Sequence, residues 1–371
     1  MAILLCFFAG CRRKPVKYPA GYHEFGYVTN GKSNTVSVLD LTSFQNIKTI
    51  NVGQNPTGAA VNTKKNEVYV VNTESNNVSI IDAERNEVVA TIGVHRAPYY
   101  ISVSDDGKRA YVANSGSANV SVIDLDARKV IATIGVGGLP GLARVSPDGT
   151  TVVASNRAGD SISIIDAQQL KVRATLPVCK QPEDVAILPD SSKAFVACTG
   201  TSQVAAVDLK NDRLLTLLDV GKTPIHLAMK PDGGEIFVCN FDGSSISAVE
   251  TQANEVGQTF LIGSNPVRAV VSDDNNTLYV SNLTSNSISI YAIDIGRMIG
   301  TLPTGARPDS LALTSNQKFL AVANTMSGDV AILRVQRTTS TSSKSKDREI
   351  VTMIRVGEQP NAIVVKAFTT K

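Results

Sequence analysis

The stretch Tyr27-Val28-Thr29-Asn30 recurs through the chain at a constant spacing of 42 residues. Related tetrapeptides end at Asn72, Asn114, Asn156, Cys198, Asn240, Asn282 and Asn324. Prolines keep the same spacing, at Pro56, Pro98, Pro140, Pro182, Pro224, Pro266 and Pro308. A fixed period of this length indicates one supersecondary unit stacked on copies of itself. Residues that depart from the repeat are therefore the candidates for an individual function.

One period of the repeat contains four short runs of β-forming residues separated by turn residues. In residues 98–140 these runs are 100–103, 109–113, 120–125 and 130–136, and we name them strands a, b, c and d. The pattern predicts a four-stranded antiparallel meander, and helical periodicity is absent. Eight b strands can be counted, but the first has no a strand before it. Residues 361–365, near the C-terminus, match the a strands of the other units.

The predicted fold is an all-β, single β-propeller with eight four-stranded blades. The C-terminal a strand joins the N-terminal b, c and d strands and closes the ring. On its Tyr-Val-x-Asn signature and four-strand unit, the chain resembles the YVTN-type β-propeller family over nearly everything after residue 26. The best-known members of that family have seven blades, so seven is the alternative count.

Composition is that of an ordinary globular protein. The 371 residues are 43% hydrophobic and 19% charged, with a formal net charge of +3 and only 5% aromatic residues. Such a weak basic charge with few stacking rings argues against nucleic acid as a partner. No stretch after the N-terminus is long enough to cross a bilayer. We expect a monomer.

The N-terminus resembles a bacterial lipoprotein signal. Residues 2–9 are apolar, and Phe8-Ala9-Gly10-Cys11 precedes a basic segment. This predicts a signal peptide over 1–10, lipidation of Cys11 and a tether over 11–26. The propeller then covers 27–366, with an insertion at 337–349 and a tail at 367–371. The expected location is the bacterial cell envelope; an unprocessed apolar N-terminus is the alternative.

Two cysteines replace repeat residues that are neighbours in one blade. Cys179 stands where other units have the glycine three residues before proline, and Cys198 stands where they have the signature asparagine. In an oxidising compartment this pair predicts a disulfide. Cys239 occupies a strand position and is expected in the core. Because the Cys and His spacings of metal and haem sites are absent, we expect no metal and no cofactor.

The loops from strand d to the next strand a diverge between repeats and surround the mouth of the central channel, on a face that we call the upper face. Rigid scaffolds with variable loops around a funnel are typical recognition sites. The candidate binding residues are Arg96, Tyr99, Tyr100, Lys180, Glu183, Asp184, Lys222, His226, Arg268, Arg307 and Asp309. Ordinary surface polarity is the alternative explanation.

These observations favour a non-enzymatic, envelope-anchored scaffold that binds a protein, peptide or glycan at the upper funnel. No catalytic residue is assigned, because no motif of a hydrolase or metalloenzyme is present. The alternative is an enzyme or redox accessory protein, either a lactonase-like hydrolase or a propeller associated with haem or quinone. A cluster of carboxylates and histidine in the funnel would favour this alternative. On the opposite face, Lys344, Lys346 and Arg348 of the insertion suggest contact with anionic lipid.

Overall fold

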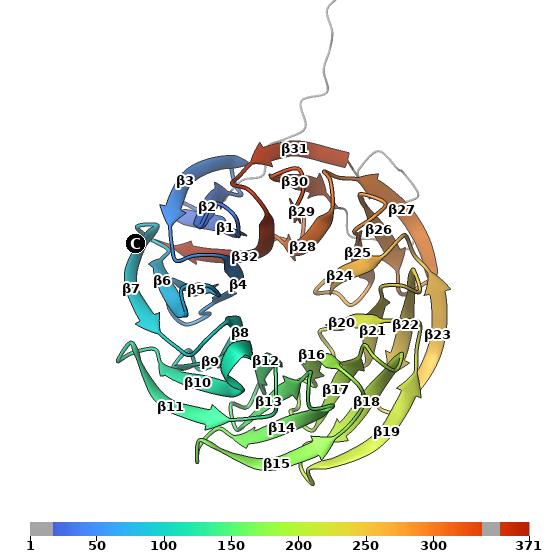
Figure 1. The fold of residues 1–371 in the computed structure, drawn as a ribbon. Helices are drawn as coiled ribbons and strands as arrows, with labels where there is room; N and C mark the ends of the chain where they lie inside the picture. The colour runs from blue at the N-terminus through green and yellow to red at the C-terminus, as the bar shows by residue number, and fades with distance from the viewer. Residues whose placement is uncertain (1–17, 336–348, 371) are drawn as a thin grey trace, which may run out of the picture.

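The chain folds into a closed ring of eight antiparallel sheets around a central channel (Figure 1). The structure is a computed structural model that describes residues 18–335 and 349–370. The predicted signal peptide, Cys11, the first part of the tether and nearly all of the insertion at 337–349 lie outside the described residues. The all-β fold and the count of eight blades are confirmed, and the seven-bladed alternative is wrong.

Every blade has four strands, ordered from the channel outward. The innermost strands are β4 (Pro56–Val61), β8 (Pro98–Val103), β12 (Pro140–Val145), β16 (Pro182–Ile187), β20 (Pro224–Met229), β24 (Pro266–Val271), β28 (Pro308–Leu313) and β32 (Pro360–Thr369). The second strands, which carry the signature, are β5 (Glu67–Asn72), β9 (Arg109–Asn114), β13 (Thr151–Asn156), β17 (Lys193–Cys198), β21 (Glu235–Asn240), β25 (Thr277–Asn282), β29 (Phe319–Asn324) and β1 (Tyr22–Asn30).

The third strands are β6 (Asn77–Asp82), β10 (Asn119–Asp124), β14 (Ser161–Asp166), β18 (Gln203–Asp208), β22 (Ser245–Glu250), β26 (Ser287–Ala292), β30 (Asp329–Arg334) and β2 (Thr35–Asp40). The outermost strands are β7 (Glu87–Gly93), β11 (Lys129–Gly135), β15 (Lys171–Pro177), β19 (Arg213–Asp219), β23 (Glu255–Leu261), β27 (Arg297–Pro303), β31 (Glu349–Arg355) and β3 (Gln45–Asn51). Among the described residues, the single helical segment is one 3₁₀ turn, η1 (Ser115–Ser117).

The two ends of the chain close the ring, as the repeat predicts. Strand β32 pairs antiparallel with β1, from Tyr22 opposite Thr369 to Asn30 opposite Pro360. This pairing extends beyond both ends of the expected propeller range, 27–366, because β1 and β32 continue alongside each other. Because β32 covers β1, the second strand of the closing blade is not left as an exposed sheet edge that could pair with another chain.

The hydrophobic core lies between neighbouring blades. Tyr69 and Ile80 of one blade, for example, pack with Ile101 and Val112 of the next, and all four are buried. Each fully buried aliphatic side chain contributes about 1.5 to 3 kcal/mol. The regular spacing of the signature therefore comes from repeated packing of each blade on the next.

In seven blades the signature asparagine donates to side chains of the third strand near the upper face, and Cys198 takes its place in the eighth. In the blade of β12–β15, Asn156 Nδ2 donates to Ser161 Oγ and Ser163 Oγ at 3.1 and 3.0 Å, while Asn156 Oδ1 accepts from the backbone N of Gly137 at 3.0 Å. Gly137 lies three residues before Pro140, in the loop that enters the blade. The asparagine therefore binds strand β14 and the incoming loop together, and the side chain is buried.

The glycine that faces this asparagine has no room for a side chain. A Cβ atom at Gly137 would lie 2.6 Å from Asn156 Cγ, whereas a Cβ at Gly135 would have no neighbour within 4 Å. We expect Gly137→Ala to lower the free energy of unfolding by about 1 to 3 kcal/mol, because the buried amide has to move. The matched control, Gly135→Ala, should change it by less than about 0.5 kcal/mol. Urea denaturation measures both variants, and equal losses would contradict the steric explanation.

Candidate functional site

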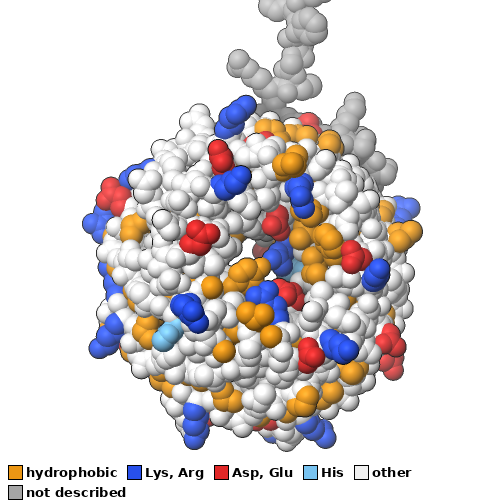
Figure 2. All heavy atoms as spheres, in the orientation of Figure 1, with side chains coloured by type: hydrophobic (Ala, Val, Ile, Leu, Met, Phe, Trp, Pro, Cys, Tyr) orange, Lys and Arg blue, Asp and Glu red, His pale blue; other side chains and the backbone are white. Residues whose placement is uncertain are grey.

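The channel wall is built from one repeat position. The residues two positions after the eight prolines all line a cavity of about 210 Å³ in the upper part of the channel; they are Gly58, Tyr100, Leu142, Asp184, His226, Arg268, Ser310 and Ala362. Small or aliphatic residues occupy four of these positions, Tyr100 occupies a fifth, and Asp184, His226 and Arg268 occupy three adjacent ones. Figure 2 shows basic and acidic side chains gathered at the central opening, with hydrophobic side chains beside them.

The backbone before each channel strand is held in a fixed, unusual conformation. The residue preceding each proline has a left-handed φ, for example 48° at Ala97 and 51° at Gln181. At five of these eight residues the N–H donates to a side chain from the turn of the previous blade, for example Ala97 N to Asn76 Oδ1 and Gln181 N to Asp160 Oδ1, each at 2.9 Å. Non-glycine residues adopt this conformation only where the surroundings impose it. The loops around the mouth are therefore well anchored.

Asp184 is the centre of the ionisable cluster. Its side chain is 6% exposed and accepts four hydrogen bonds. Oδ1 accepts from Val185 N at 2.8 Å and Arg144 Nη2 at 3.5 Å, and Oδ2 accepts from Leu227 N at 3.0 Å and His226 Nδ1 at 2.8 Å. Burial by itself would raise the pKa of Asp184, but the hydrogen bond and charge of His226, with Arg144 and Arg268, hold that pKa well below its usual value.

His226 carries a hydrogen bond on each ring nitrogen. Nδ1 faces the Asp184 carboxylate, and Nε2 lies 3.2 Å from the carbonyl oxygen of Ala269. Because both partners are acceptors, the protonated imidazolium satisfies both bonds. Arg268 Nη1 lies 3.4 Å from His226 Nδ1. No carboxylate lies within salt-bridge distance of the Arg268 guanidinium among residues 18–335 and 349–370, although Asp309 and Asp184 are near enough for their charges to raise its pKa.

The cluster continues around the channel to the neighbouring blades. The Arg144 guanidinium lies 5.4 Å from the centre of the Tyr100 ring, and about a third of the Arg144 side chain stays open to the channel. Nearer the mouth, Arg157 lies over the Tyr99 ring at 5.0 Å and pairs with Glu183 at 3.4 Å. Side chains of successive blades therefore form a continuous chain of polar contacts along one side of the wall.

Two guanidinium groups lie on the cavity wall. Arg144 and Arg268 stand near the buried Asp184 carboxylate, while Glu183, which also lines the cavity, pairs with Arg157. Burial raises the pKa of Asp309, and the nearby charges of Arg268, His226 and Arg307 offset this only in part. A cavity wall with two guanidinium groups is suited to bind an anion, above all a carboxylate or phosphate, which guanidinium groups bind through paired hydrogen bonds.

The structure brings together only some of the residues selected from the sequence. Tyr100, Glu183, Asp184, His226 and Arg268 line the channel cavity with Tyr99, and Asp309 lies beside it. Arg96, Lys180 and Lys222 are exposed farther out on the upper face and contact none of the cluster. His95 is exposed as well, with its ring near Thr133 of the outer strand β11. Histidine chemistry at the channel therefore rests on His226 alone.

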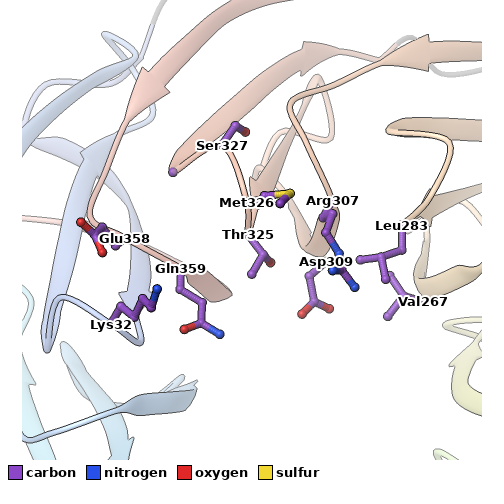
Figure 3. Close-up of a pocket in the computed structure, with 11 residues that line it drawn as sticks. Lys32, Val267, Leu283, Arg307, Asp309, Thr325, Met326, Ser327, Glu358 and Gln359 are labelled. Atoms are coloured by element: carbon purple, nitrogen blue, oxygen red, sulfur yellow. The ribbon is translucent and has the colours of Figure 1, made fainter.

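Arg307 and Asp309 belong to a second cavity on the rim, shown in Figure 3. Its volume is about 620 Å³, and it lies over the last blades and the closing blade. Its wall includes Val267, Leu283 and Met326 together with four charged side chains: Lys32, Arg307 and Glu358 from three connections, and Asp309 from β28. This cavity and the channel cavity are adjacent, since Val267 and Arg268, and likewise Asp309 and Ser310, are sequence neighbours that line one each.

Two functional residues escaped the sequence analysis. Arg144 lies four residues after Pro140, inside strand β12 rather than in a loop, and Arg157 follows the signature asparagine of β13. The repeat could have revealed Arg144, because the corresponding residues in other units are small or aliphatic, as at Ala60, Ser102 and Ala186. Because Arg144 lies inside a strand, a choice of candidates from the loops does not include it.

Cys179 and Cys198 form a disulfide with their Cα atoms 5.7 Å apart. The bridge lies in the blade that supplies Asp184. In the same blade, Gln203 and Ala205 replace the hydroxyl and amide acceptors that the signature asparagine uses elsewhere, such as Ser161 and Ser163. Cys239 is buried with a free thiol. Within the described part of the chain, no group of three or more His, Cys, Asp or Glu residues is arranged to hold a metal ion.

Two family models match parts of the chain. Residues 62–185 match the cytochrome D1 haem domain, and residues 263–353 match the seven-bladed lactonase β-propeller. The first segment includes Tyr100, Arg144 and Asp184, and the second includes Arg268 and Asp309. No curated protein matches the chain. Each match covers less than half of the sequence, so the two matches support a propeller of this general kind.

Solved structures show the same fold at low identity. Dihydro-haem d1 dehydrogenase NirN has a TM-score of 0.77 and 13% identity, over 95% of this chain and 77% of that one. Hydrazine synthase of Kuenenia stuttgartiensis has a TM-score of 0.61 and 21% identity, over 72% and 91%. A 6-phosphogluconolactonase homologue of Bacteroides uniformis has a TM-score of 0.62 and 18% identity, over 84% and 98%. The class defined by these comparisons is the β-propeller, here with eight blades.

Proposed function

We propose that the protein binds a carboxylate-bearing small molecule at the upper end of its channel and acts as a ligand-associated or cofactor-associated propeller. The observation that carries the proposal is the Arg268 guanidinium, which lies on the cavity wall with no carboxylate of the described residues within salt-bridge distance. Arg144 adds positive charge on the same wall. A cluster of carboxylate, histidine and arginine side chains favours this function over a scaffold for a protein partner.

The carboxylates of a tetrapyrrole are the first candidate ligand, because NirN and the cytochrome D1 domain are named for haem d1. The residues present suit the carboxylates but not the iron. Both ring nitrogens of His226 are engaged, by Asp184 and by the Ala269 carbonyl, so neither offers a lone pair to a metal. The proposal therefore concerns recognition of the acidic groups, and no step through a haem iron is derived.

The test compares protoporphyrin IX with its dimethyl ester, a metal-free pair that differs only in its carboxylates. We expect the free acid to bind and the ester to bind at least about tenfold more weakly. Arg268→Gln should weaken binding of the acid by about ten- to a hundredfold, because a charged hydrogen bond contributes about 1.5 to 3 kcal/mol. Lys222→Gln, which removes an exposed rim charge, is the control. Absorbance titration measures the affinities, and equal binding of acid and ester would contradict the proposal.

Hydrolysis of a lactone is the second candidate. Asp309 favours it, because a carboxyl group with a raised pKa beside Arg268 could accept a proton from water while the guanidinium holds the substrate oxygen. The match to the lactonase model covers both residues. Lactone hydrolysis that is present in the wild type and lost in Asp309→Asn would identify this activity, and unchanged hydrolysis in the variant would exclude Asp309 as the base.

The location of the protein and its larger partners stay predictions. We predict that Cys11 is lipidated, that the protein lies in the bacterial cell envelope, and that its lower face contacts the membrane. A protein, peptide or glycan partner is predicted at the upper face. In the described residues no helix is long and apolar enough to span a membrane. Labelling with a lipid precursor tests the anchor, and a Cys11 that stays unmodified would be decisive against it.

A further inference from the structure

The mouth of the channel is apolar on one side. Two repeat positions border it: the residue after each proline and the residue after each signature asparagine. Polar or small residues predominate there, including Thr57, Gly141, Thr73 and Ser115. In two adjacent blades, β20–β23 and β24–β27, both positions become apolar: Ile225 and Phe241, then Val267 and Leu283.

Met326, in the turn between β29 and β30 of the next blade, continues this apolar side. Its side chain is 73% exposed, although all seven corresponding turns carry Lys, Glu, Gly, Ala, Asp or Thr at that position. Val267, Leu283 and Met326 together line the rim cavity (Figure 3). Three apolar side chains from two blades therefore face one open space on the upper face.

This space adjoins the Arg268 guanidinium of the channel. Val267 and Arg268 are neighbours in β24, one lining the rim cavity and the other the channel cavity. The channel cavity, about 210 Å³, is smaller than the range of about 300 to 1,000 Å³ that is typical of small-molecule sites. The rim cavity, about 620 Å³, falls inside that range. A single ligand would thus place its acidic group in the channel and its remaining atoms against the apolar wall.

We propose that Val267, Leu283 and Met326 select a carboxylate with an apolar body, which lies in the rim cavity while the acidic group reaches Arg268. This inference rests on the proposed function and narrows its ligand class: hydrophobic carboxylic acids are favoured over sugar acids. An apolar body gains from leaving water at this wall, whereas the hydroxyl groups of a sugar acid would lose hydrogen bonds to water there.

The experiment compares 3-phenylpropionate with gluconate, two monocarboxylates that differ in the polarity of the body. Isothermal titration calorimetry on the wild type should show 3-phenylpropionate binding at least about tenfold more tightly. The variant Val267→Thr/Leu283→Thr should lower that affinity about tenfold and leave gluconate unchanged. Threonine occupies the same repeat positions at Thr57 and Thr73, so the variant is compatible with the fold.

The control is Leu139→Asn, which removes an exposed leucine elsewhere on the upper face and introduces the residue found at the corresponding Asn55. It should change neither affinity. Equal binding of the two acids, or an equal loss of both in the double variant, would overturn the inference and leave carboxylate binding intact. Failure of both acids to bind would also overturn it, while the porphyrin titration decides the proposed function independently.

Discussion

Replacement of Asp184 by asparagine is expected to lower the free energy of unfolding by about 3 kcal/mol at neutral pH. The carboxylate is 6% exposed and accepts bonds from His226, Arg144 and two backbone N–H groups. Its neutral replacement leaves the buried cations without a counter-charge, and breaking a buried ion pair costs about 3 to 5 kcal/mol. We take the low end of this range because Arg144 is partly open to channel water, which screens its charge.

The pH dependence of this loss has a definite sign. The pKa of Asp184 is lower in the folded protein than in the unfolded chain, so its contribution is fully present above the unfolded value of about 3.9. The contribution disappears as the pH falls below that value toward the folded pKa. Urea denaturation of wild type and Asp184→Asn should therefore show the largest difference between pH 5 and 7 and a smaller one near pH 3.

A matched control separates the buried cluster from a surface turn. Asp190 accepts local hydrogen bonds from Ser192 in an exposed turn, and Asp190→Asn should cost no more than about 1 kcal/mol. A loss at Asp184 as small as the loss at Asp190 would mean that the channel cations do not depend on Asp184.

Replacement of the disulfide by the repeat residues, Cys179→Gly/Cys198→Asn, is expected to cost about 3 kcal/mol. The bridge joins residues 19 positions apart, and closing a loop of that size in the unfolded chain contributes about 3 kcal/mol. The asparagine cannot recover this energy, because Ala205 offers no hydroxyl where the blade of Asn156 has Ser163. The measurement is urea denaturation with and without reductant.

A second substitution tests this explanation. Adding Ala205→Ser to the double variant should recover about 1 kcal/mol, the typical contribution of one hydrogen bond. The same substitution in the wild type should give no gain, since its buried hydroxyl would lack the asparagine amide. Reductant should lower the stability of the wild type and not that of the Gly/Asn variant. A wild type that is insensitive to reductant would show that the bridge contributes little.

The fold could be predicted because it follows from local, repeated information. The signature of Tyr27–Asn30 returns at a fixed spacing, so the blade could be derived from one period and then counted. The closing strand could be recognised at residues 361–365, since a b strand without an a strand needs a partner. The longer pairing of β1 with β32 was not foreseen, because Tyr22–Phe25 lie before the first signature and carry no repeat pattern.

The candidate site was only partly predictable. Asp184, His226 and Arg268 could be selected because they depart from the repeat beside their prolines. Arg144 was missed, because its importance depends on contacts with Asp184 and Tyr100, which come from the blades on either side. Arg96, Lys180 and Lys222 are equally polar in sequence, but their connections direct them away from the channel.

By itself, then, the sequence determined the strand unit, the number of blades and the way the ring closes, because hydrophobic periodicity and turn residues act over a few neighbouring positions. Only the tertiary structure decided which ionisable side chains meet. Residues 42 positions apart become neighbours on the channel wall when the ring closes, and there an arginine outside any salt bridge of the described residues lies next to an apolar rim. Charge and burial at that point depend on several blades at once, which no single repeat encodes.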